Sequence, residues 1–231
     1  MFTFPTTFNS SAEGGGGGGP TGIGGEILWL MPETGLTDLS GNGNDGTYFG
    51  DATVSGGEFV FDGVGDYITS PVSLSGRSAA TISAWGTRTA TNKRIGVGQQ
   101  KFDALGMVWY TNAVLYCIIN WISDPDSDPP MYGYVTVAGV GPHHFCLVFD
   151  GSGGTNADRL KLYVDGANRT LNYNGTVPSV LPTMTDPFEI GRLTSSFYTT
   201  GSHDDIRVFN RAISASEAAT LYNSGVPGVG A

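Results

Sequence analysis

The residues best suited to bind a cation are aspartates that stand beside glycine turns. In the segment FDGVGD, Asp62 offers a carboxylate next to glycine turns that leave backbone carbonyls free, and Asp66 follows four residues later. Ca²⁺ takes six to eight oxygen ligands from carboxylates and loop carbonyls, so this pattern predicts a Ca²⁺ site. The alternative is that these side chains cap turns by accepting hydrogen bonds from backbone N–H groups. Both interpretations stay open, with turn capping ahead.

A second acidic segment, SDPDSDPPMYGYV, places Asp124, Asp126 and Asp128 at alternate positions, as at the start of an EF-hand loop. Pro129 stands where that loop requires glycine, and Val135 stands where it requires glutamate. The segment is therefore predicted to be a solvated acidic loop rather than a dedicated Ca²⁺ site.

No group of residues in the sequence matches a catalytic constellation. Ser202, His203 and Asp204 have the residue types of a hydrolytic triad, but a triad is assembled in space and not from three consecutive residues. His143 and His144 are adjacent in a strand-like segment, so they point to opposite faces and do not suit one metal ion. The sequence places no two carboxylates in a cleft, as a glycosidase requires. We therefore expect a protein that is not an enzyme.

Aromatic residues are the other group that could contact a ligand. Trp121, Tyr132 and Tyr198 flank polar loops, and aromatic rings there could pack against the apolar faces of sugars. The alternative is that they fill the core, because aromatic side chains supply much of any core. Trp109 is expected in the core, whereas Trp121, Tyr132 and Tyr198 are the candidates for a glycan-binding surface.

The elements that must hold these residues read as short strands. Glycine accounts for 36 of the 231 residues and charged residues for only 14%, which is typical of strands joined by tight turns. In GEFVFDGVGDYITS, Phe59 and Phe61 share one face, and in AATISAWGT, Ile82 and Ala84 lie opposite Trp85. More than ten such segments at short spacing predict an all-β sandwich or barrel.

One helix and two buried thiols complete the predicted domain. Ser214 and Glu217 form a capping box at the start of AISASEAATLYNSG, which predicts a helix of about ten residues packed on the sandwich. Cys117 and Cys146 both lie in apolar strand-like segments, so buried free thiols are the favoured interpretation. The sequence leaves open whether they pair.

The charge of the chain is negative and uneven. The net charge is −10, and residues 1–76 hold nine acidic residues and no Lys or Arg. Such a surface is repelled by phosphate backbones and anionic lipid heads, so we expect no nucleic-acid partner. No run of 18 apolar residues occurs, so we expect no membrane insertion, and the N-terminus lacks the pattern of an export signal.

Residues 1–25 read as an arm that precedes a domain of residues 26–231. Its first part carries Phe2, Phe4, Pro5 and Phe8, and six consecutive glycines follow at 14–19. Fixing such a segment costs about 1–2 kcal/mol of backbone entropy per residue, so alone in water it should be disordered. Packing against other subunits is the simplest compensation. We therefore expect an assembly arm in which the four apolar residues are the anchor.

The order of the segments DLSGNGNDGTYFG, FVFDGVGDYITS, ATISAWGT, HHFCLVFDG, LKLYVDG, FEIGR and HDDIRVFNRAISASEAATLYNSG resembles the laminin-G-like, concanavalin A-like jelly-roll family over residues 26–225. The resemblance implies an antiparallel jelly-roll sandwich of two sheets with one short C-terminal helix. It also implies carbohydrate or protein binding, and it makes Asp62 and Asp204 the candidate ligands of a Ca²⁺ ion, with Asp66 and Asp205 as further contributors.

Two functions remain in view at this point. The first is a non-enzymatic virion surface protein, a capsid decoration or tail fibre, in which residues 1–25 bind other virion proteins. In that case the domain projects outward as a lectin-like adhesion module for a host-surface glycan, and the protein forms a homo-oligomer. The alternative is a secreted or cell-surface carbohydrate-binding module, working outside cells with Ca²⁺ as its cofactor. Fold alone does not choose between them.

Overall fold

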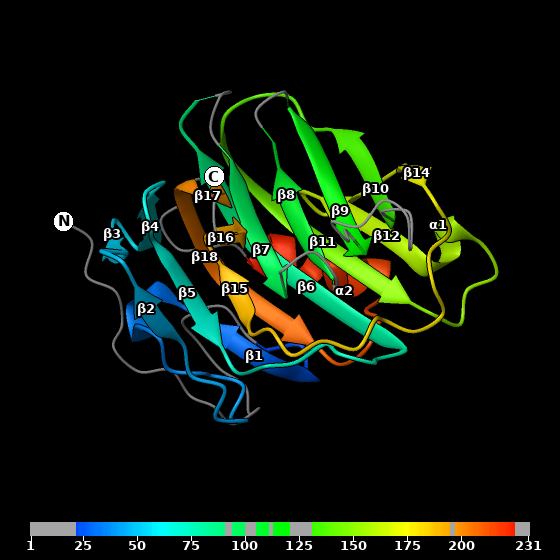
Figure 1. Ribbon diagram of the computed structural model, residues 1–231, viewed down its shortest axis with the longest axis horizontal. Coiled ribbons are helices and arrows are strands. Elements are labelled where there is room, and N and C mark those ends of the chain that lie inside the picture. The colour runs from blue at the N-terminus through cyan, green and yellow to red at the C-terminus, as the bar shows by residue number, and fades with distance from the viewer. Residues whose placement is uncertain are drawn as a thin grey trace.

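The structure is a computed structural model, and elements are labelled in chain order as in Figure 1. The described residues are 22–90, 94–99, 105–110, 113–120, 131–194 and 197–224.

Two antiparallel sheets, each of eight strands, lie face to face (Figure 1). The first, sheet A, consists of β1 (Glu26–Leu30), β3 (Thr53–Ser55), β4 (Glu58–Asp62), β6 (Ala79–Arg88), β11 (Gly141–Asp150), β12 (Leu160–Val164), β13 (Ala167–Arg169) and β18 (Thr200–Phe209). The second, sheet B, consists of β2 (Thr47–Phe49), β5 (Tyr67–Ser70), β7 (Ile95–Gln99), β8 (Gly106–Trp109), β9 (Val114–Asn120), β10 (Met131–Thr136), β14 (Asn172–Asn174) and β15 (Phe188–Ile190). This arrangement is the jelly-roll sandwich that the sequence predicts.

The strand order shows how the sandwich is closed at its sides. Sheet A runs β13-β12-β11-β6-β18-β4-β3, with β1 also paired to β18, and sheet B runs β14-β10-β9-β8-β7-β15-β5-β2. One lateral edge is therefore formed by β2 and β3, and the other by β13 and β14. Each edge pair is consecutive in the sequence and crosses from one sheet to the other. A small hairpin of β16 (Arg192–Thr194) and β17 (Phe197–Tyr198) follows β15.

The core fills the space between the sheets with alternate residues of each strand. Phe59 and Phe61 of β4 and Ile82 and Ala84 of β6 are buried there, as predicted from their spacing. Trp109 of β8 is also a core residue, with 1% of its surface exposed. The two inner faces thus share one continuous apolar cluster, which is the main source of stability of the domain.

Two polar side chains cross this core and tie the sheets together. The guanidinium of Arg88 on β6 lies 3.6 Å from the ring centroid of Trp109 and donates to the carbonyl of Tyr110, at 2.9 Å. His203 on β18 lies between the carbonyl oxygens of Trp85 on β6 and Gly96 on β7, at 3.1 and 3.2 Å from its ring nitrogens. Burial lowers the pKa of His203 to about 4, so this imidazole is neutral at pH 7.

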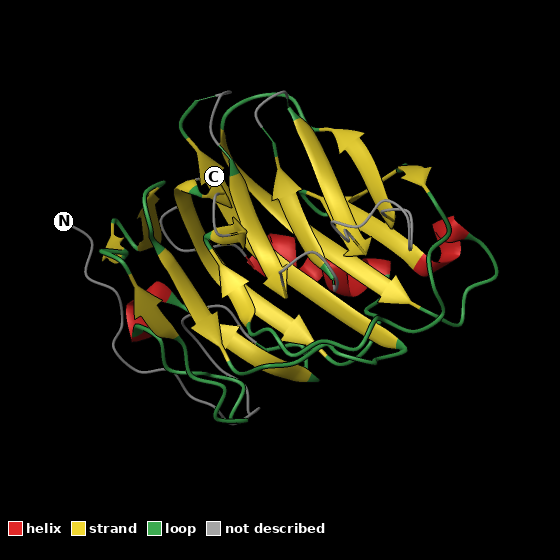
Figure 2. Cartoon of the chain, viewed as in Figure 1, coloured by secondary structure: helices red, strands yellow, loops and turns green. Residues whose placement is uncertain are grey.

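Helix α2 (Ala215–Ser224) covers part of the outer face of sheet A, behind the sheets in the view of Figure 2. The capping box is confirmed, because the Glu217 N–H donates to Ser214 Oγ while Glu217 Oε2 accepts from the Ser214 N–H. The buried side chains of Ala218 and Leu221 pack with Ile213 in an apolar cluster on this face. Two short elements that the sequence analysis did not predict are the 3₁₀ turn η1 (Pro32–Thr34) and the helix α1 (Asn156–Arg159).

Cys117 and Cys146 are both buried and free. This confirms the favoured prediction of buried free thiols. They belong to different layers, because Cys117 faces the core and Cys146 lies in the apolar cluster under α2. Burial raises the pKa of both thiols, so they stay protonated and unreactive at neutral pH.

None of the helices in the described residues has the length and apolar character needed to cross a membrane.

Truncation of a core side chain should destabilise the whole sandwich. Leu147 is fully buried in the shared core, and we expect Leu147→Ala to lower the free energy of unfolding by about 2–5 kcal/mol. Val180 is 48% exposed, so Val180→Ala serves as the control and should change stability by less than about 0.5 kcal/mol. Urea unfolding followed by tryptophan fluorescence measures both. Equal effects of the two substitutions would contradict the assigned core.

Candidate functional site

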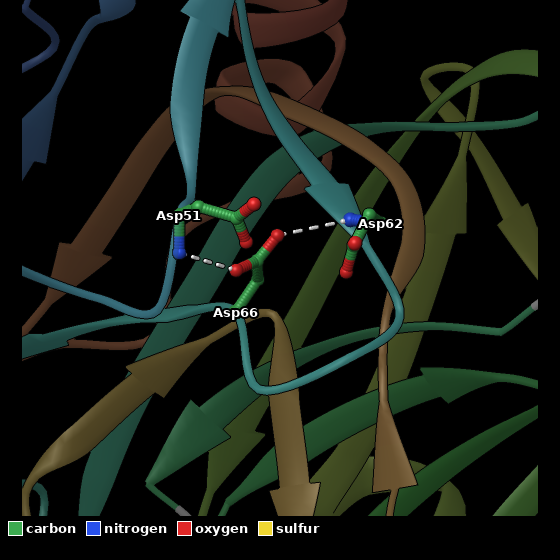
Figure 3. A group of neighbouring side chains, drawn as sticks. All are labelled: Asp51, Asp62 and Asp66. Atoms are coloured by element: carbon green, nitrogen blue, oxygen red, sulfur yellow. Dashed lines mark hydrogen bonds between the residues drawn. The ribbon is translucent and has the colours of Figure 1, made fainter.

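Three aspartates meet where the β2–β3 turn approaches the β4–β5 turn (Figure 3). Asp51 lies in the first turn, Asp62 ends β4, and Asp66 precedes β5. One carboxylate oxygen from each lies within 4.8 Å of the other two. Asp51 and Asp62 are exposed, whereas Asp66 is buried with 2% of its surface exposed. We call these three residues the acidic cluster.

Hydrogen bonds to the backbone position the acidic cluster. Asp66 accepts the N–H of Asp51 at 2.8 Å through Oδ1 and the N–H of Asp62 at 3.1 Å through Oδ2, and Figure 3 shows its side chain between the other two. Asp62 Oδ1 accepts the N–H of Val64 at 2.6 Å. The predicted turn-capping role of Asp62 and Asp66 is therefore confirmed. Capping uses one lone pair of each oxygen, so it leaves the carboxylates able to bind a cation as well.

Gly50 allows the two turns to approach each other. Its φ is 73°, and a Cβ atom there would lie 2.4 Å from Asp66 Oδ1 and 2.7 Å from the carbonyl oxygen of Gly65. Any side chain at this position would both strain the backbone and push the turns apart. The close approach of the acidic cluster thus depends on this one glycine.

The geometry of the acidic cluster suits Ca²⁺. Ca²⁺–oxygen bonds of about 2.3–2.6 Å place ligand oxygens up to about 5 Å apart across the ion, which accommodates the 4.8 Å limit observed here. Three carboxylates so close repel one another, and a bound divalent cation would relieve that repulsion. The residues that would hold it are Asp51 and Asp62 at the surface and Asp66 beneath them.

Aromatic residues neighbour the acidic cluster in the chain. Phe49 and Tyr67 are parallel, with ring centroids 4.6 Å apart and planes 3° apart, and Phe49 is 40% exposed. The guanidinium of Arg192 lies 3.7 Å from the Tyr67 centroid and forms an ion pair with Glu189. Tyr198 lies 6.4 Å from Tyr67, centroid to centroid. We call Phe49, Tyr67 and Tyr198 the aromatic group.

The structure brings two of the predicted site residues into one neighbourhood. Thr200 on β18 pairs with Asp62 on β4, and Tyr198 precedes Thr200 by two residues. Asp62 and Tyr198, predicted separately as a Ca²⁺ ligand and a glycan contact, therefore belong to the same end of the sandwich. Tyr132 lies elsewhere, on β10 of sheet B.

Asp204 does not share this location. It lies four residues beyond Thr200 along β18, or roughly 13 Å at the rise of a strand, so Asp62 and Asp204 cannot bind one ion. A β-bulge between Asp204 and Arg207, with Asp205 at a φ of 43°, turns the polar side chains of this segment to the outer face of sheet A. There Asp205 accepts hydrogen bonds from Trp29 Nε1 at 2.8 Å and Arg207 Nε at 2.7 Å.

A row of buried polar atoms without partners surrounds Asp204. His144, Trp85 and Asp204 are register partners on β11, β6 and β18, and each is more than nine-tenths buried. Among the described residues, His144 Nδ1, Trp85 Nε1, Asp204 Oδ2 and both carboxylate oxygens of Glu33 are buried with no hydrogen-bond partner. Tyr222 of α2 stacks on Trp85 with centroids 5.7 Å apart. Such concentration in one place is uncommon, because nearly all buried polar groups are paired.

Asp204 and His144 are accommodated in this buried row because both side chains are neutral. Burial, and then the nearby charges of Glu33 and Asp205, raise the pKa of Asp204 to about 9. Burial lowers the pKa of His144 to about 4, so neither side chain is charged at pH 7. The raised pKa of Asp204 is typical of a general acid, but its side chain has no solvent access and cannot reach a substrate.

His143 and His144 point to opposite sides of sheet A, as predicted. His143 contacts the edge of Trp109 in the core and its Nδ1 pairs with Asp165 Oδ2 at 2.7 Å, whereas the Nε2 of His144 bonds Ser83 Oγ at 2.9 Å on the outer face. Both histidines therefore have structural roles.

Several predicted residues lie outside the described part of the chain. These are the arm anchor Phe2, Phe4, Pro5 and Phe8, the glycan candidate Trp121, and the acidic loop with Asp124, Asp126 and Asp128. Conversely, the sequence analysis missed Asp51, Phe49, Tyr67 and Glu33. Asp51 follows a glycine and precedes a short strand, and this was the only local signal for it.

Comparison with known proteins agrees with this architecture. The family model described as the concanavalin A-like lectin/glucanases superfamily matches residues 62–219. Among curated proteins, no match is found.

Solved structures of botulinum neurotoxin binding domains share the fold. A structure from work on cell entry of botulinum neurotoxin type C, which depends on interaction with two ganglioside molecules, is 12% identical with a TM-score of 0.65, covering 87% of this chain and 51% of the other. The binding domain of neurotoxin DC in complex with rat synaptotagmin II is 10% identical with a TM-score of 0.64, at the same coverages of 87% and 51%. The same domain in complex with SialylT is 11% identical with a TM-score of 0.63. This chain spans about half the length of the toxin domains, and the likeness concerns the fold alone.

The buried carboxyl of Asp204 should make stability depend on pH. Folding raises the pKa of Asp204 from 3.8 to about 9. Its stabilising contribution to the free energy of unfolding is therefore complete below pH 3.8 and is lost as the pH rises towards 9. Between pH 7 and 9 we expect the free energy of unfolding to fall by roughly 1 kcal/mol per pH unit through this group. Asp204→Asn should remove that slope, whereas Asp150→Asn, at the end of β11, should keep it. Urea unfolding at pH 7, 8 and 9, with EDTA present, measures the slopes. Identical slopes in wild type and Asp204→Asn would show that Asp204 is ionised at pH 7.

Proposed function

Because the chain belongs to the concanavalin A-like lectin/glucanases superfamily, we propose that it is a non-enzymatic, lectin-like adhesion module whose ligand is carbohydrate. In this proposal a Ca²⁺ ion binds the acidic cluster, and the adjacent aromatic group receives the sugar. The module is carried on a virion surface, as a capsid decoration or tail-fibre protein, by residues 1–25.

The observation that carries the proposal is that the acidic cluster and the aromatic group come from neighbouring positions of the same turns and strands. Asp66 directly precedes Tyr67, and Asp51 lies two residues after Phe49. A cation held by carboxylates can take two further oxygens from sugar hydroxyls, while an exposed ring packs on the apolar face of the same sugar. Carboxylates and a half-exposed aromatic ring on the same turns thus supply both parts of a Ca²⁺-dependent carbohydrate site.

The surroundings of the carboxylates favour binding over catalysis. Asp51 and Asp62 are exposed on turns, and neither lies in the apolar cleft that a general acid of a glycosidase needs. Asp66 has both oxygens engaged by backbone N–H groups. The Ca²⁺ prediction for Asp204 stays a prediction, and any ion there is separate from the acidic cluster.

The proposed carrier rests on the composition of residues 1–25. An apolar anchor of Phe2, Phe4, Pro5 and Phe8 followed by six glycines suits a thin tether that becomes ordered against other virion proteins. A homo-oligomer would present several copies of the module, so weak individual sites would add up to firm attachment to a host-surface glycan.

The alternative is a secreted or cell-surface carbohydrate-binding module with the same site. The neurotoxin binding domains in complex with rat synaptotagmin II and with SialylT support a binding role for this fold. The two proposals differ in what carries the module and in its location, virion or extracellular, and agree on the ligand class.

Removing one carboxylate of the acidic cluster should weaken Ca²⁺ and glycan binding together. Calorimetric titration of the full chain should show one Ca²⁺ site with a Kd on the order of 10⁻⁴–10⁻³ M, and Asp62→Asn should raise that Kd by about tenfold. On a glycan array, Asp62→Asn and EDTA treatment should abolish the same signals, and Asp150→Asn should preserve them. Ca²⁺ binding that Asp62→Asn leaves unchanged would overturn the site.

Deletion of the arm should separate the two carriers. If residues 1–25 anchor the protein in a virion, a chain that starts at Glu26 should fold and bind Ca²⁺ normally but fail to enter particles. Sedimented particles probed for the protein measure its incorporation. Equal incorporation of both chains would exclude the anchoring role of residues 1–25, and the adhesion site would be unaffected by that result.

A further inference from the structure

Exposed apolar side chains concentrate at the lateral edge of the sandwich that β2 and β3 form. Of the seven large hydrophobic residues that are exposed in the described part of the chain, four lie within residues 48–64. They are Tyr48 at 37%, Phe49 at 40%, Val54 at 39% and Val64 at 76% exposure. Phe49 belongs to the aromatic group, and we call Tyr48, Val54 and Val64 the apolar corner. Such a concentration is more typical of a contact surface than single exposed residues, which are normal on any protein.

Core packing brings two members of the apolar corner together. The ring centroid of Tyr48 lies 6.4 Å from that of Phe59, and Val54 on β3 is the register partner of Phe59 on β4. Phe59 itself is completely buried. Tyr48 from sheet B and Val54 from sheet A thus both neighbour one core residue, at the side where the two sheets end. The edge of the core is therefore exposed here.

The β4–β5 turn presents Val64 next to the same edge. Gly63 and Gly65, on either side of Val64, have φ values of 94° and 84°, and Asp62 Oδ1 accepts the Val64 N–H at 2.6 Å. A Cβ atom at Gly50 would lie 2.7 Å from the carbonyl oxygen of Gly65, so this turn approaches the turn that joins β2 to β3. A side chain held on a fixed turn costs little entropy when a partner covers it.

The charge around the apolar corner decides what kind of partner fits it. Residues 47–67, which contain the corner, include no Lys or Arg but four carboxylates, Asp51, Glu58, Asp62 and Asp66. The guanidinium groups of Arg94 and Arg192, from adjoining segments, lie over the rings of Tyr110 and Tyr67. A second copy of the chain would meet like charge at this corner, which disfavours it as the partner. A surface with an apolar centre and a rim of Lys or Arg is complementary instead.

We propose that the apolar corner is a docking surface for another protein, whose contact segment carries apolar side chains flanked by Lys or Arg. The apolar side chains cover the corner, and the cations pair with Asp51 and Asp62, the exposed members of the acidic cluster. This contact goes beyond the proposed glycan site. One consequence rests on the proposed function, because the same carboxylates hold Ca²⁺ there. Ca²⁺ and the basic partner then compete, and each weakens the binding of the other by the same factor.

The test uses a matched pair of probes, a short amphipathic peptide of leucine and lysine and the same peptide with glutamate in place of lysine. In calorimetric titration of the full chain with EDTA present, the lysine peptide should bind more tightly by about tenfold. Val54→Thr and Val64→Thr keep the shape of the side chain and should each weaken binding by about threefold. Val180→Thr is the matched control, because Val180 is 48% exposed but lies in the loop before β15, outside the apolar corner. Each variant is accepted only if its thermal unfolding matches that of the wild type.

Ca²⁺ supplies the second part of the test. At constant ionic strength, saturating Ca²⁺ should raise the Kd of the lysine peptide by about tenfold, and Asp62→Asn should reduce that effect. A chain that binds Ca²⁺ without any change in peptide affinity would overturn the competition and leave the proposed Ca²⁺ site in place. A chain that binds no Ca²⁺ but binds the lysine peptide through the apolar corner would overturn the Ca²⁺ site and the competition, and it would support the docking surface.

Other results would reject the docking surface itself or assign it to another occupant. Equal binding of the two peptides would exclude a basic partner, and equal effects of Val64→Thr and Val180→Thr would exclude the apolar corner. Self-association of the full chain in sedimentation, lost in Val64→Thr, would assign the corner to a second copy. Ca²⁺-dependent binding to phosphatidylserine vesicles that Val64→Thr weakens would assign it to a membrane surface.

Discussion

The two sheets face one shared interior, and this constraint decides what every strand can do. Alternate residues must be apolar and of fitting size, so the other half of each long strand is left for roles outside the core. On sheet A that second half supports α2 and the polar row around Asp204. On sheet B it carries Tyr116, Tyr132 and Tyr134, whose rings lie together on the outer face. The acidic cluster lies in the turns, where the alternation no longer applies.

The β-bulge in β18 is the main departure from this regular alternation. By inserting one extra residue opposite β6, it directs Asp204, Asp205 and Arg207 to the same outer face. Arg207 and Trp29 satisfy Asp205, but Asp204 is left with a buried oxygen that has no partner. The protein therefore keeps a costly polar group in the strand that joins β6, β4 and β1. The bulge thus places three charged residue types on one face of sheet A within four positions, which regular alternation would not allow.

The sequence predicted the fold well because fold information is local and periodic. The spacing of Phe59 and Phe61, the opposition of Ile82 and Trp85 and the Ser214 capping box each determine local geometry, and the structure confirms them. The acidic cluster was only half predicted. Asp62 and Asp66 share one turn, but Asp51 joins them through the approach of the β2–β3 turn to the β4–β5 turn. Tyr116 of β9 and Tyr132 and Tyr134 of β10 are likewise far apart in the sequence, so only the register shows that they form one surface. Periodicity carries no information about register between distant segments.

The short strands at the lateral edges of the sandwich limit how copies of this domain can associate. The strands β2, β3, β13 and β14 contain three residues each, so each offers a neighbouring chain very few backbone groups to pair with. Edge strands this short disfavour pairing between the sheet of one molecule and that of the next. Copies of this domain can therefore pack side by side at high concentration without pairing into fibrils. Their broad faces stay available in such an array.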